Sequence, residues 1–439
     1  MTCGIRSGCR RPPEIRGEQP VIPAGYPDTK TNTIIHMKQH PSLARSIVMA
    51  AALSAGTAMA GSTTAPVETG KTAVEPAGQT DWCEKLWSLA TLYKNDSNPF
   101  IQEIALTGRY QGQYAMVDSD GGNSDGWDHR RFRTGIRMKF LKDFEVKFEE
   151  FGDLNKDDFY SGFTEAYVAW KPNDQFNLTV GKQKPKFSTD WSTSSREILT
   201  IERNIMINNL GIDYETGVVV NGKSGNWSYY AGAFNNDVGE TGEDSEFGDL
   251  DGGWSYIASL GYDAKDTFGT EKAIVRADYI HMEHDTQDDL LTRFDNAFAA
   301  SLTLKQGQWG LVSEFMYAEG DDSIRNGGDF WGFYIMPSYD INKKLQVVAR
   351  YTYASSSDDA LRAQNRYERG TDGIIHTNPF SSDSGYGESY HAGYLGLNYY
   401  ICGHKLKLMT GLEYATMDGG SDGGDNDSWT WSSGLRLYF

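Results

Sequence analysis

Four basic residues recur within one short segment of the chain: Arg131, Arg133, Arg137 and Lys139. Side chains alternate between the two faces of an extended strand, so all four would lie on one face at multiples of about 7 Å. A guanidinium group presents forked N–H donors that match the oxygens of a phosphate or a carboxylate. The spacing therefore predicts a column of cations that is suited to handling anions.

The following segment offers a second interpretation of this column. Glu145, Lys147 and Glu149 alternate in the same way, and the two carboxylates could neutralise the neighbouring cations. The column would then be a charge-balanced, solvated wall and not a binding surface. The sequence leaves both interpretations open.

The elements that must position these residues are strands. The other face of the same segment is apolar, and similar two-faced segments recur along the chain from Ile101 onward. Sixteen strands are predicted, at residues 102–117, 128–141, 144–152, 163–172, 176–182, 213–223, 227–235, 254–264, 271–284, 296–306, 309–320, 329–340, 345–355, 388–402, 405–417 and 427–439. The last of them carries aromatic residues near both ends, as is typical of a strand that crosses a bilayer.

Short turns and long connections alternate between these strands. The long connections cover residues 118–127, 153–162, 183–212, 236–253, 285–295, 321–328, 356–387 and 418–426. An antiparallel barrel with short periplasmic turns and long outer loops has this arrangement, whereas a β-sandwich has long connections at both ends. The predicted fold is therefore all-β, a 16-stranded antiparallel transmembrane β-barrel whose strand number leaves an aqueous lumen.

The third long connection, residues 183–212, is long for an exposed loop without internal structure, and it carries apolar side chains such as Phe187. We therefore expect it to fold into the barrel and constrict the pore. Three lysines at its entry would then lie near the constriction, where few charges decide which ions pass: Lys182, Lys184 and Lys186. Alternation places Lys182 and Lys184 on the same side of the chain.

Short motifs in this region resemble the phosphate-selective porin O/P family of bacterial outer-membrane proteins. They are Arg130-Arg131-x-Arg133, the Gly-Lys-x-Lys-x-x-Phe run at 181–187, Ser-Ser-Arg at 194–196 and Ile-Glu-Arg-Asn at 201–204. The resemblance implies a homotrimer of barrels in the outer membrane, in contact with lipid and lipopolysaccharide. It also implies that small anions, phosphate or polyphosphate, pass from a basic wall with Arg131 and Arg133 to a site formed by the three lysines.

Other residues depart from a strongly basic pore. Arg350 is a further candidate for the pore lining, but acidic residues are expected on the same inner faces, among them Glu165, Asp278, Glu314 and Glu413. The formal net charge of the whole chain is −19. A general or sugar-type diffusion porin without anion selectivity is therefore the alternative function.

The N-terminal part of the chain has a different organisation. Residues 37–60 combine basic residues, an apolar stretch and an Ala-x-Ala end, which predicts a signal peptide preceded by a mis-called extension at 1–36. A periplasmic linker and a short helix at 81–93 are expected within 61–100, followed by the barrel at 101–439. The helix could plug the barrel or brace it from below.

The composition excludes several classes of protein. A strongly acidic chain is unsuited to nucleic acid, and the histidines form no catalytic signature, so neither an enzyme nor a cofactor or metal site is predicted. Of four cysteines, only Cys83 and Cys402 follow the predicted signal peptide, and both map to the side of the short turns. A disulfide that ties the helix to the barrel is therefore possible.

Overall fold

A computed structural model describes residues 81–120, 122–155, 159–235, 247, 253–283, 294–320, 327–357, 360–362, 386–419 and 425–439. The predicted extension, signal peptide and linker lie outside these residues, and so do most residues of several long connections. No helix among the described residues is long and apolar enough to cross a membrane.

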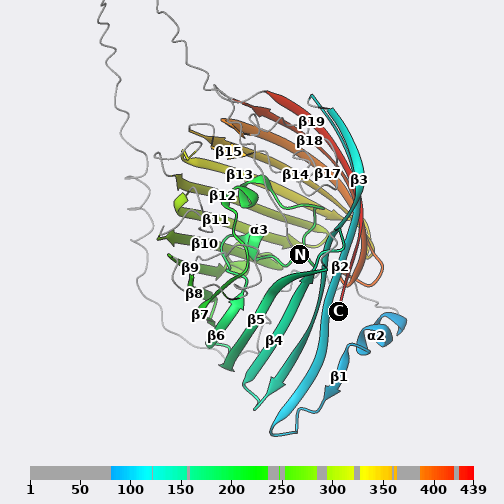
Figure 1. Ribbon diagram of the computed structural model, residues 1–439, viewed down its shortest axis with the longest axis vertical. Helices are drawn as coiled ribbons and strands as arrows, with labels where there is room; N and C mark the ends of the chain where they lie inside the picture. Colours follow the sequence, from blue (N-terminus) through cyan, green and yellow to red (C-terminus); the bar gives the residue numbers. More distant parts are fainter. Residues whose placement is uncertain are drawn as a thin grey trace, which may run out of the picture. The chain divides into compact units, whose positions relative to one another are not determined.

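Sixteen antiparallel strands form one closed sheet, as the sequence predicts (Figure 1). They are β2 (Ile101–Ser119), β3 (Gly122–Phe140), β4 (Phe144–Gly152), β5 (Tyr160–Asn173), β6 (Phe176–Gln183), β7 (Glu215–Ser224), β8 (Trp227–Asn235), β9 (Trp254–Asp263), β10 (Lys272–Met282), β11 (Phe294–Gln306), β12 (Trp309–Gly320), β13 (Phe330–Asp340), β14 (Leu345–Ser356), β17 (Ser389–Tyr400), β18 (Leu406–Asp418) and β19 (Asn426–Tyr438). Each strand pairs with the next along the chain, and β19 pairs with β2 to close the ring. Two further strands, β15 (Leu361–Arg362) and β16 (Tyr386–Gly387), pair only with each other.

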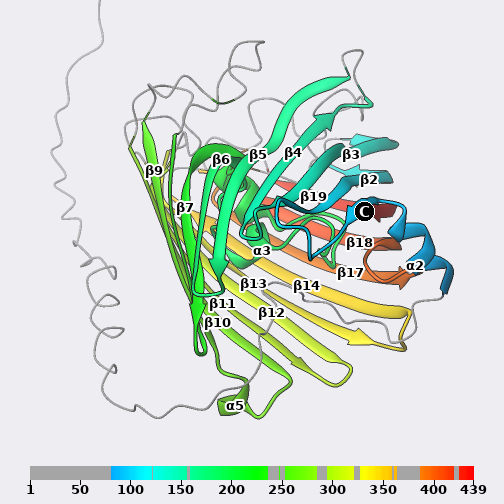
Figure 2. The ribbon, with the colours of Figure 1, turned by 90° about the horizontal axis from the view of Figure 1, so that it is seen from below.

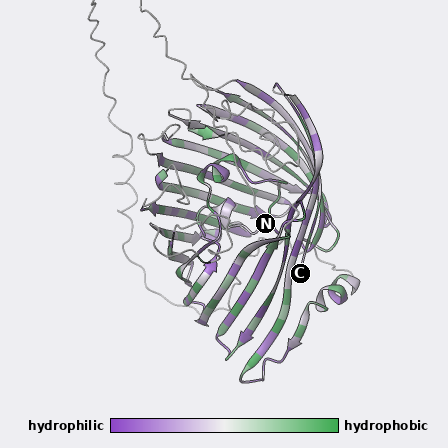
Figure 3. Cartoon of the chain, in the orientation of Figure 1, coloured by the Kyte–Doolittle hydropathy of each residue, from purple (hydrophilic) through white to green (hydrophobic). Residues whose placement is uncertain are grey.

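The two faces of the sheet have different chemistry because side chains alternate along each strand. Large apolar residues such as Leu106, Val168 and Leu260 are 40–49% exposed on the outer face. Polar residues such as Gln111 and Glu149 are buried on the inner face, where they contact other residues inside the barrel. Figure 3 shows the resulting alternation of hydrophobic and hydrophilic residues along the strands.

Tight turns connect the strands at one end of the barrel, which we call the short-turn end. Gly225 and Gly307 adopt left-handed φ values of 58° and 54° between their strands. A side chain would be strained in this region of backbone space, whereas glycine adopts it freely. A longer turn between β9 and β10 contains the helix α5 (Lys265–Phe268).

The N-terminal helix is shorter than predicted. Helix α2 (Asp81–Ser88) ends five residues early, and Thr91–Lys94 instead form strand β1, which pairs with β2. The reason lies in the barrel: β19 ends where Tyr438 pairs with Arg109. The residues of β2 that precede Arg109 therefore have no partner in β19, and β1 pairs with them at Glu103–Ala105.

Helix α2 braces the short-turn end of the barrel and does not plug the lumen. Cys83 and Cys402 form a disulfide with a Cα–Cα distance of 5.9 Å, and the Trp87 indole donates a hydrogen bond to the Tyr438 carbonyl over 2.5 Å. In Figures 1 and 2 the helix lies beside the C-terminus. The possible disulfide is thus present, and it joins the helix to the turn between β17 and β18.

Replacing Cys83 and Cys402 together by serine is expected to leave the barrel closed but to expose α2 to proteolysis. The sheet closes through backbone hydrogen bonds that do not involve either cysteine, whereas the short helix would keep few contacts. Limited trypsin digestion should cut the variant at Lys85 or Lys94, which the wild type should resist. Equal resistance of both proteins would contradict a bracing role for the disulfide.

Candidate pore-lining site

The connection between β6 and β7, residues 184–214, lies inside the barrel and is called the third loop below. It contains two short helices, α3 (Thr189–Ser192) and α4 (Ile205–Leu210). Figures 1 and 2 show α3 enclosed by the ring of strands. The loop reaches inner-face residues on opposite sides of the barrel, because Ser195 bonds Arg109 on β2 while Ser188 bonds Glu314 on β12.

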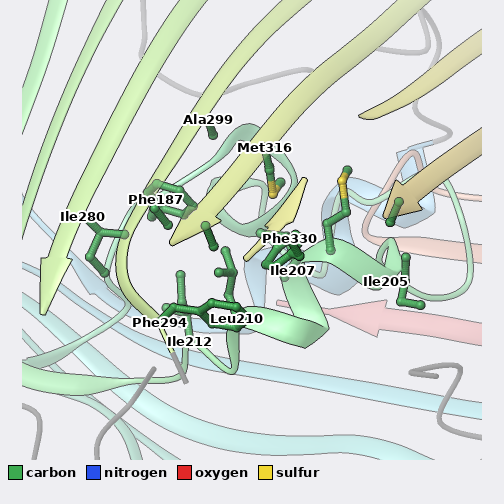
Figure 4. Packing of buried hydrophobic residues seen from close by; sticks show 14 of the residues in the cluster. Phe187, Ile205, Ile207, Leu210, Ile212, Ile280, Phe294, Ala299, Met316 and Phe330 are labelled. Atoms are coloured by element: carbon green, nitrogen blue, oxygen red, sulfur yellow. The ribbon is translucent and has the colours of Figure 1, made fainter. Parts of the chain in front are cut away.

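An apolar cluster holds the second half of the third loop against β10–β13. Ile207 and Leu210 of α4 are only 2% and 1% exposed. With Phe187 they pack against inward-facing residues of these strands (Figure 4), among them Ile280, Phe294, Ala299, Met316 and Phe330. This wall of the lumen is therefore apolar where the loop covers it.

A buried carboxylate holds the first half of the loop against the same wall. Glu314 accepts hydrogen bonds from the backbone N–H groups of Thr189 (2.5 Å) and Asp190 (3.2 Å) and from the Ser188 hydroxyl (3.3 Å). These groups lie at the start of α3, where backbone N–H groups have no partner within the helix. Glu314 is thus an inner-face residue, as predicted, but its carboxylate holds the third loop in place.

The Ile-Glu-Arg-Asn motif braces the loop internally and to the wall. Asp190 accepts hydrogen bonds from the backbone N–H (3.0 Å) and the side-chain amide (2.7 Å) of Asn204, and it pairs with Arg203 at 3.4 Å. Glu202 pairs with Arg130 at 3.0 Å. Burial alone would raise the pKa of Glu202, but Arg130 and Arg131 outweigh it and lower the pKa below its ordinary value.

The four residues of the predicted basic column do share the inner face of β3. Their partners on β2, from Gln111 opposite Arg131 to Glu103 opposite Lys139, face the same way. Arg131 donates to Gln111 over 2.8 Å, while Arg137 and Lys139 both pair with Glu103. The column therefore keeps more cations than acids, although part of its charge is neutralised.

A β-bulge adds Arg130 to this surface. Gln111 and Gln113 of β2 oppose Arg131 and Asp128, so β3 has one extra residue at this point. Simple alternation would send Arg130 to the lipid, but its side chain instead reaches Glu202 inside the barrel. The sequence pattern missed this residue as a site candidate, although the run of consecutive arginines was the available signal.

The densest group of charges surrounds Glu149 on β4. Its carboxylate lies 3.2 Å from Arg109, 3.6 Å from Arg133, 3.2 Å from Lys147 and 3.2 Å from Arg196 of the third loop. Both acids expected to balance the column lie beside it. Glu149 pairs with Arg133, while Glu145 lies opposite Lys139 and also bonds Lys171 over 2.7 Å.

The three lysines at the loop entry have different environments. Lys182 shares a face of β6 with Val180, and its cross-strand partner Thr216 shares a face with Val218. Both valines are nearly half exposed on the outer face of the barrel, so the prediction that Lys182 lines the pore is wrong. The alternation argument failed because β6 ends at Gln183, after which the chain turns inward.

Lys184 and Lys186 belong to the third loop. The Lys184 ammonium lies 4.2 Å from the centre of the Trp191 ring and 3.4 Å from the Thr193 carbonyl. Burial and the nearby Arg203 lower the pKa of Lys184 well below its ordinary value. The side chain of Lys186 is exposed, and its carbonyl accepts a hydrogen bond from Arg276 over 2.8 Å.

Arg350 lies on the inner face of β14 and ties the wall to the loop. It pairs with Glu413 at 2.9 Å and donates to the Thr200 hydroxyl (3.2 Å) and the Glu202 carbonyl (3.1 Å). Arg276 and Asp278 form another inner-face pair at 2.5 Å. The predicted mixture of acids and bases around the lumen is therefore present, with the excess of cations gathered on β2–β4.

The family model for phosphate-selective porins O and P matches residues 104–427, which covers most of the chain. The chain belongs to this porin family. Membership places it in the bacterial outer membrane and points to a channel rather than an enzyme. In this porin the family-like motifs fix the third loop: Ser195 and Arg196 dock on Arg109 and Glu149.

Solved porin structures share the fold of this porin at low sequence identity. The outer membrane channel DcaP of Acinetobacter baumannii matches with a TM-score of 0.52 and 14% identity, over 79% of this chain and 100% of that one. An anion-selective porin from Comamonas acidovorans gives 0.53 and 12%, over 76% and 99%. OprB of Pseudomonas putida gives 0.51 and 14%, over 76% and 94%. No curated protein matches the sequence.

Proposed function

We propose that this porin is a passive diffusion channel for small anions, with phosphate or polyphosphate as the physiological solute. Basic side chains of β3, the third loop and β14 would line its path: Arg131, Arg133, Arg137, Lys139, Lys184, Lys186 and Arg350. The third loop would form the constriction, and the porin would work as a homotrimer in a lipid layer that contains lipopolysaccharide.

The observation that carries this proposal is the excess of cations on one side of the lumen. Arg109, Arg133, Lys147 and Arg196 converge on the single carboxylate of Glu149. Charges that line a water-filled passage with low-dielectric walls focus their field along it and raise the local concentration of counter-ions. Anions would therefore be enriched beside β2–β4.

A general diffusion porin is the second candidate, favoured by the paired charges elsewhere in the lumen. Arg350 with Glu413 and Arg276 with Asp278 are neutral as pairs. If such pairs dominated the path, neither anions nor cations would be preferred. The two candidates therefore differ in a sign that can be measured.

We expect the wild-type porin to be more permeable to chloride than to potassium. In a planar bilayer with a potassium chloride gradient, the sign of its reversal potential should therefore be that of a chloride current. Inorganic phosphate at millimolar concentration is expected to reduce the chloride current, because it would compete for the same cations. A reversal potential near zero without phosphate block would support the general porin, and a potential of the sign set by potassium would exclude anion selectivity.

A further inference from the structure

We propose that the Glu149 carboxylate is a built-in anion, which occupies the strongest oxyanion site of the barrel and thereby sets how tightly a permeating oxyanion is held. The inference rests on the proposed anion conduction and deepens it. It assigns to one residue the role of a resident competitor for phosphate or carboxylate groups.

The geometry around Glu149 is that of an occupied anion site. Its four cationic neighbours come from four separate elements, namely β2, β3, β4 and the third loop. The Glu149 side chain is fully buried, so its carboxylate meets these cations and no bulk water. Two or more guanidinium groups around one oxyanion are the arrangement with which proteins bind phosphate and carboxylate ligands.

The cluster retains positive charge and hydrogen-bond donors beyond those that Glu149 uses. Apart from Glu149, the one other acid paired with these four cations is Glu165, which contacts Lys147, among the residues that the structure describes. The Nε atoms of Arg109, Arg133 and Arg196 are buried and have no acceptor within the described part of the chain. Three buried donors of the cluster thus stay without an acceptor among these residues, so one carboxylate does not saturate it.

A resident carboxylate has a consequence for conduction. A channel site must bind an ion strongly enough to admit it and weakly enough to release it. Four converging cations without Glu149 would hold a phosphate tightly and slow its exit. With Glu149 in place, the same cations still attract anions to this wall, but an entering oxyanion finds the deepest position already filled.

Replacing Glu149 by glutamine tests this role because it removes the resident negative charge, and replacing Glu149 by alanine also empties the position that the carboxylate fills. Inorganic phosphate is expected to block the chloride current of the glutamine variant at a concentration at least roughly ten-fold lower than in the wild type, a change equivalent to one decade in Kd. The matched control is Glu145→Gln, the same substitution on the same strand. Glu145 bonds Lys171 and Tyr167 and contacts none of the four cations around Glu149, so its loss should change the phosphate block far less.

A second measurement covers the case in which unpaired cations destabilise the variant. In detergent, the thermal unfolding temperature of Glu149→Gln and Glu149→Ala is expected to rise with added phosphate or acetate, because a ligand that binds only the folded state stabilises it. The wild type and Glu145→Gln should show no such rise. Unfolding temperatures that are equally insensitive to both anions in all four proteins would overturn the inference.

A different result is expected if Glu149 only anchors the third loop. Glu314→Gln weakens another loop contact but leaves no cation unpaired, because Glu314 forms no ion pair among the described residues, so it reports loop loosening alone. If Glu149→Gln and Glu314→Gln change the current alike and neither tightens the phosphate block, the built-in anion is overturned. The wild-type reversal potential tests anion conduction separately, so failure of the one is distinguishable from failure of the other.

Discussion

Replacing Ile207 and Leu210 together by aspartate is expected to raise the single-channel conductance several-fold. Both side chains are almost completely buried between α4 and the apolar wall of β10–β13. Each contributes roughly 1.5–3 kcal/mol to docking by removing apolar surface from water. Two unpaired carboxylates cannot stay in that cluster, so α4 should leave the wall and the third loop should no longer narrow the lumen.

The barrel itself should survive this double substitution. Its strands close into a ring through β19 and β2, and the backbone hydrogen bonds of the ring do not depend on the loop. The variant should therefore keep the wild-type mobility of a folded barrel on a gel run without heating. Asn208→Asp is the matched control, because it adds an acid to α4 on a side chain that is already partly exposed. Wild-type conductance in the double variant would contradict a constricting loop.

Neutralising two residues of the basic column, Arg131 and Arg133, is the second change with a large expected effect. In Arg131→Gln combined with Arg133→Gln, the reversal potential in a salt gradient should move most of the way to zero. Two charges would be removed from the side of the lumen where cations exceed acids, and Glu149 would keep Arg109, Lys147 and Arg196. The loop should stay in place because its apolar docking is unchanged.

Lys182 provides the matched control for this experiment. It is a basic residue of β6, and the strand register puts it on the outer face of the barrel. Lys182→Gln should therefore leave the reversal potential where it is in the wild type. An equal shift in Lys182→Gln and the double variant would show that selectivity follows total charge and not the inner wall.

Most of the barrel could be predicted from local sequence. The bounds of β4, β8 and β12 agree with the predicted strands to the residue, because alternation and tight turns are properties of the chain itself. Away from the bulge in β3 and the end of β6, the face of a residue followed from the same alternation. That is why the inner positions of Arg131, Arg133 and Arg350 could be predicted.

What escaped prediction depends on a second segment of chain. Arg130 points inward because β3 carries a bulge against β2, and an alternating pattern does not reveal where a register shift falls. The early end of α2 depends on the open edge of β2, and the four partners of Glu149 come from distant positions. These features depend on contacts between elements that are distant in the sequence. The sequence therefore indicated which charged residues face the lumen but not which of them lie together.

The Cys83–Cys402 bond has a consequence for how the barrel is built. It spans 319 residues and joins the segment before β2 to the turn before β18. In the oxidising periplasm such a bond would turn the unfolded chain into a ring and remove much of the entropy that its ends lose on meeting. The effective concentration of β2 near β19 would rise, and these two strands form the seam at which the barrel must close.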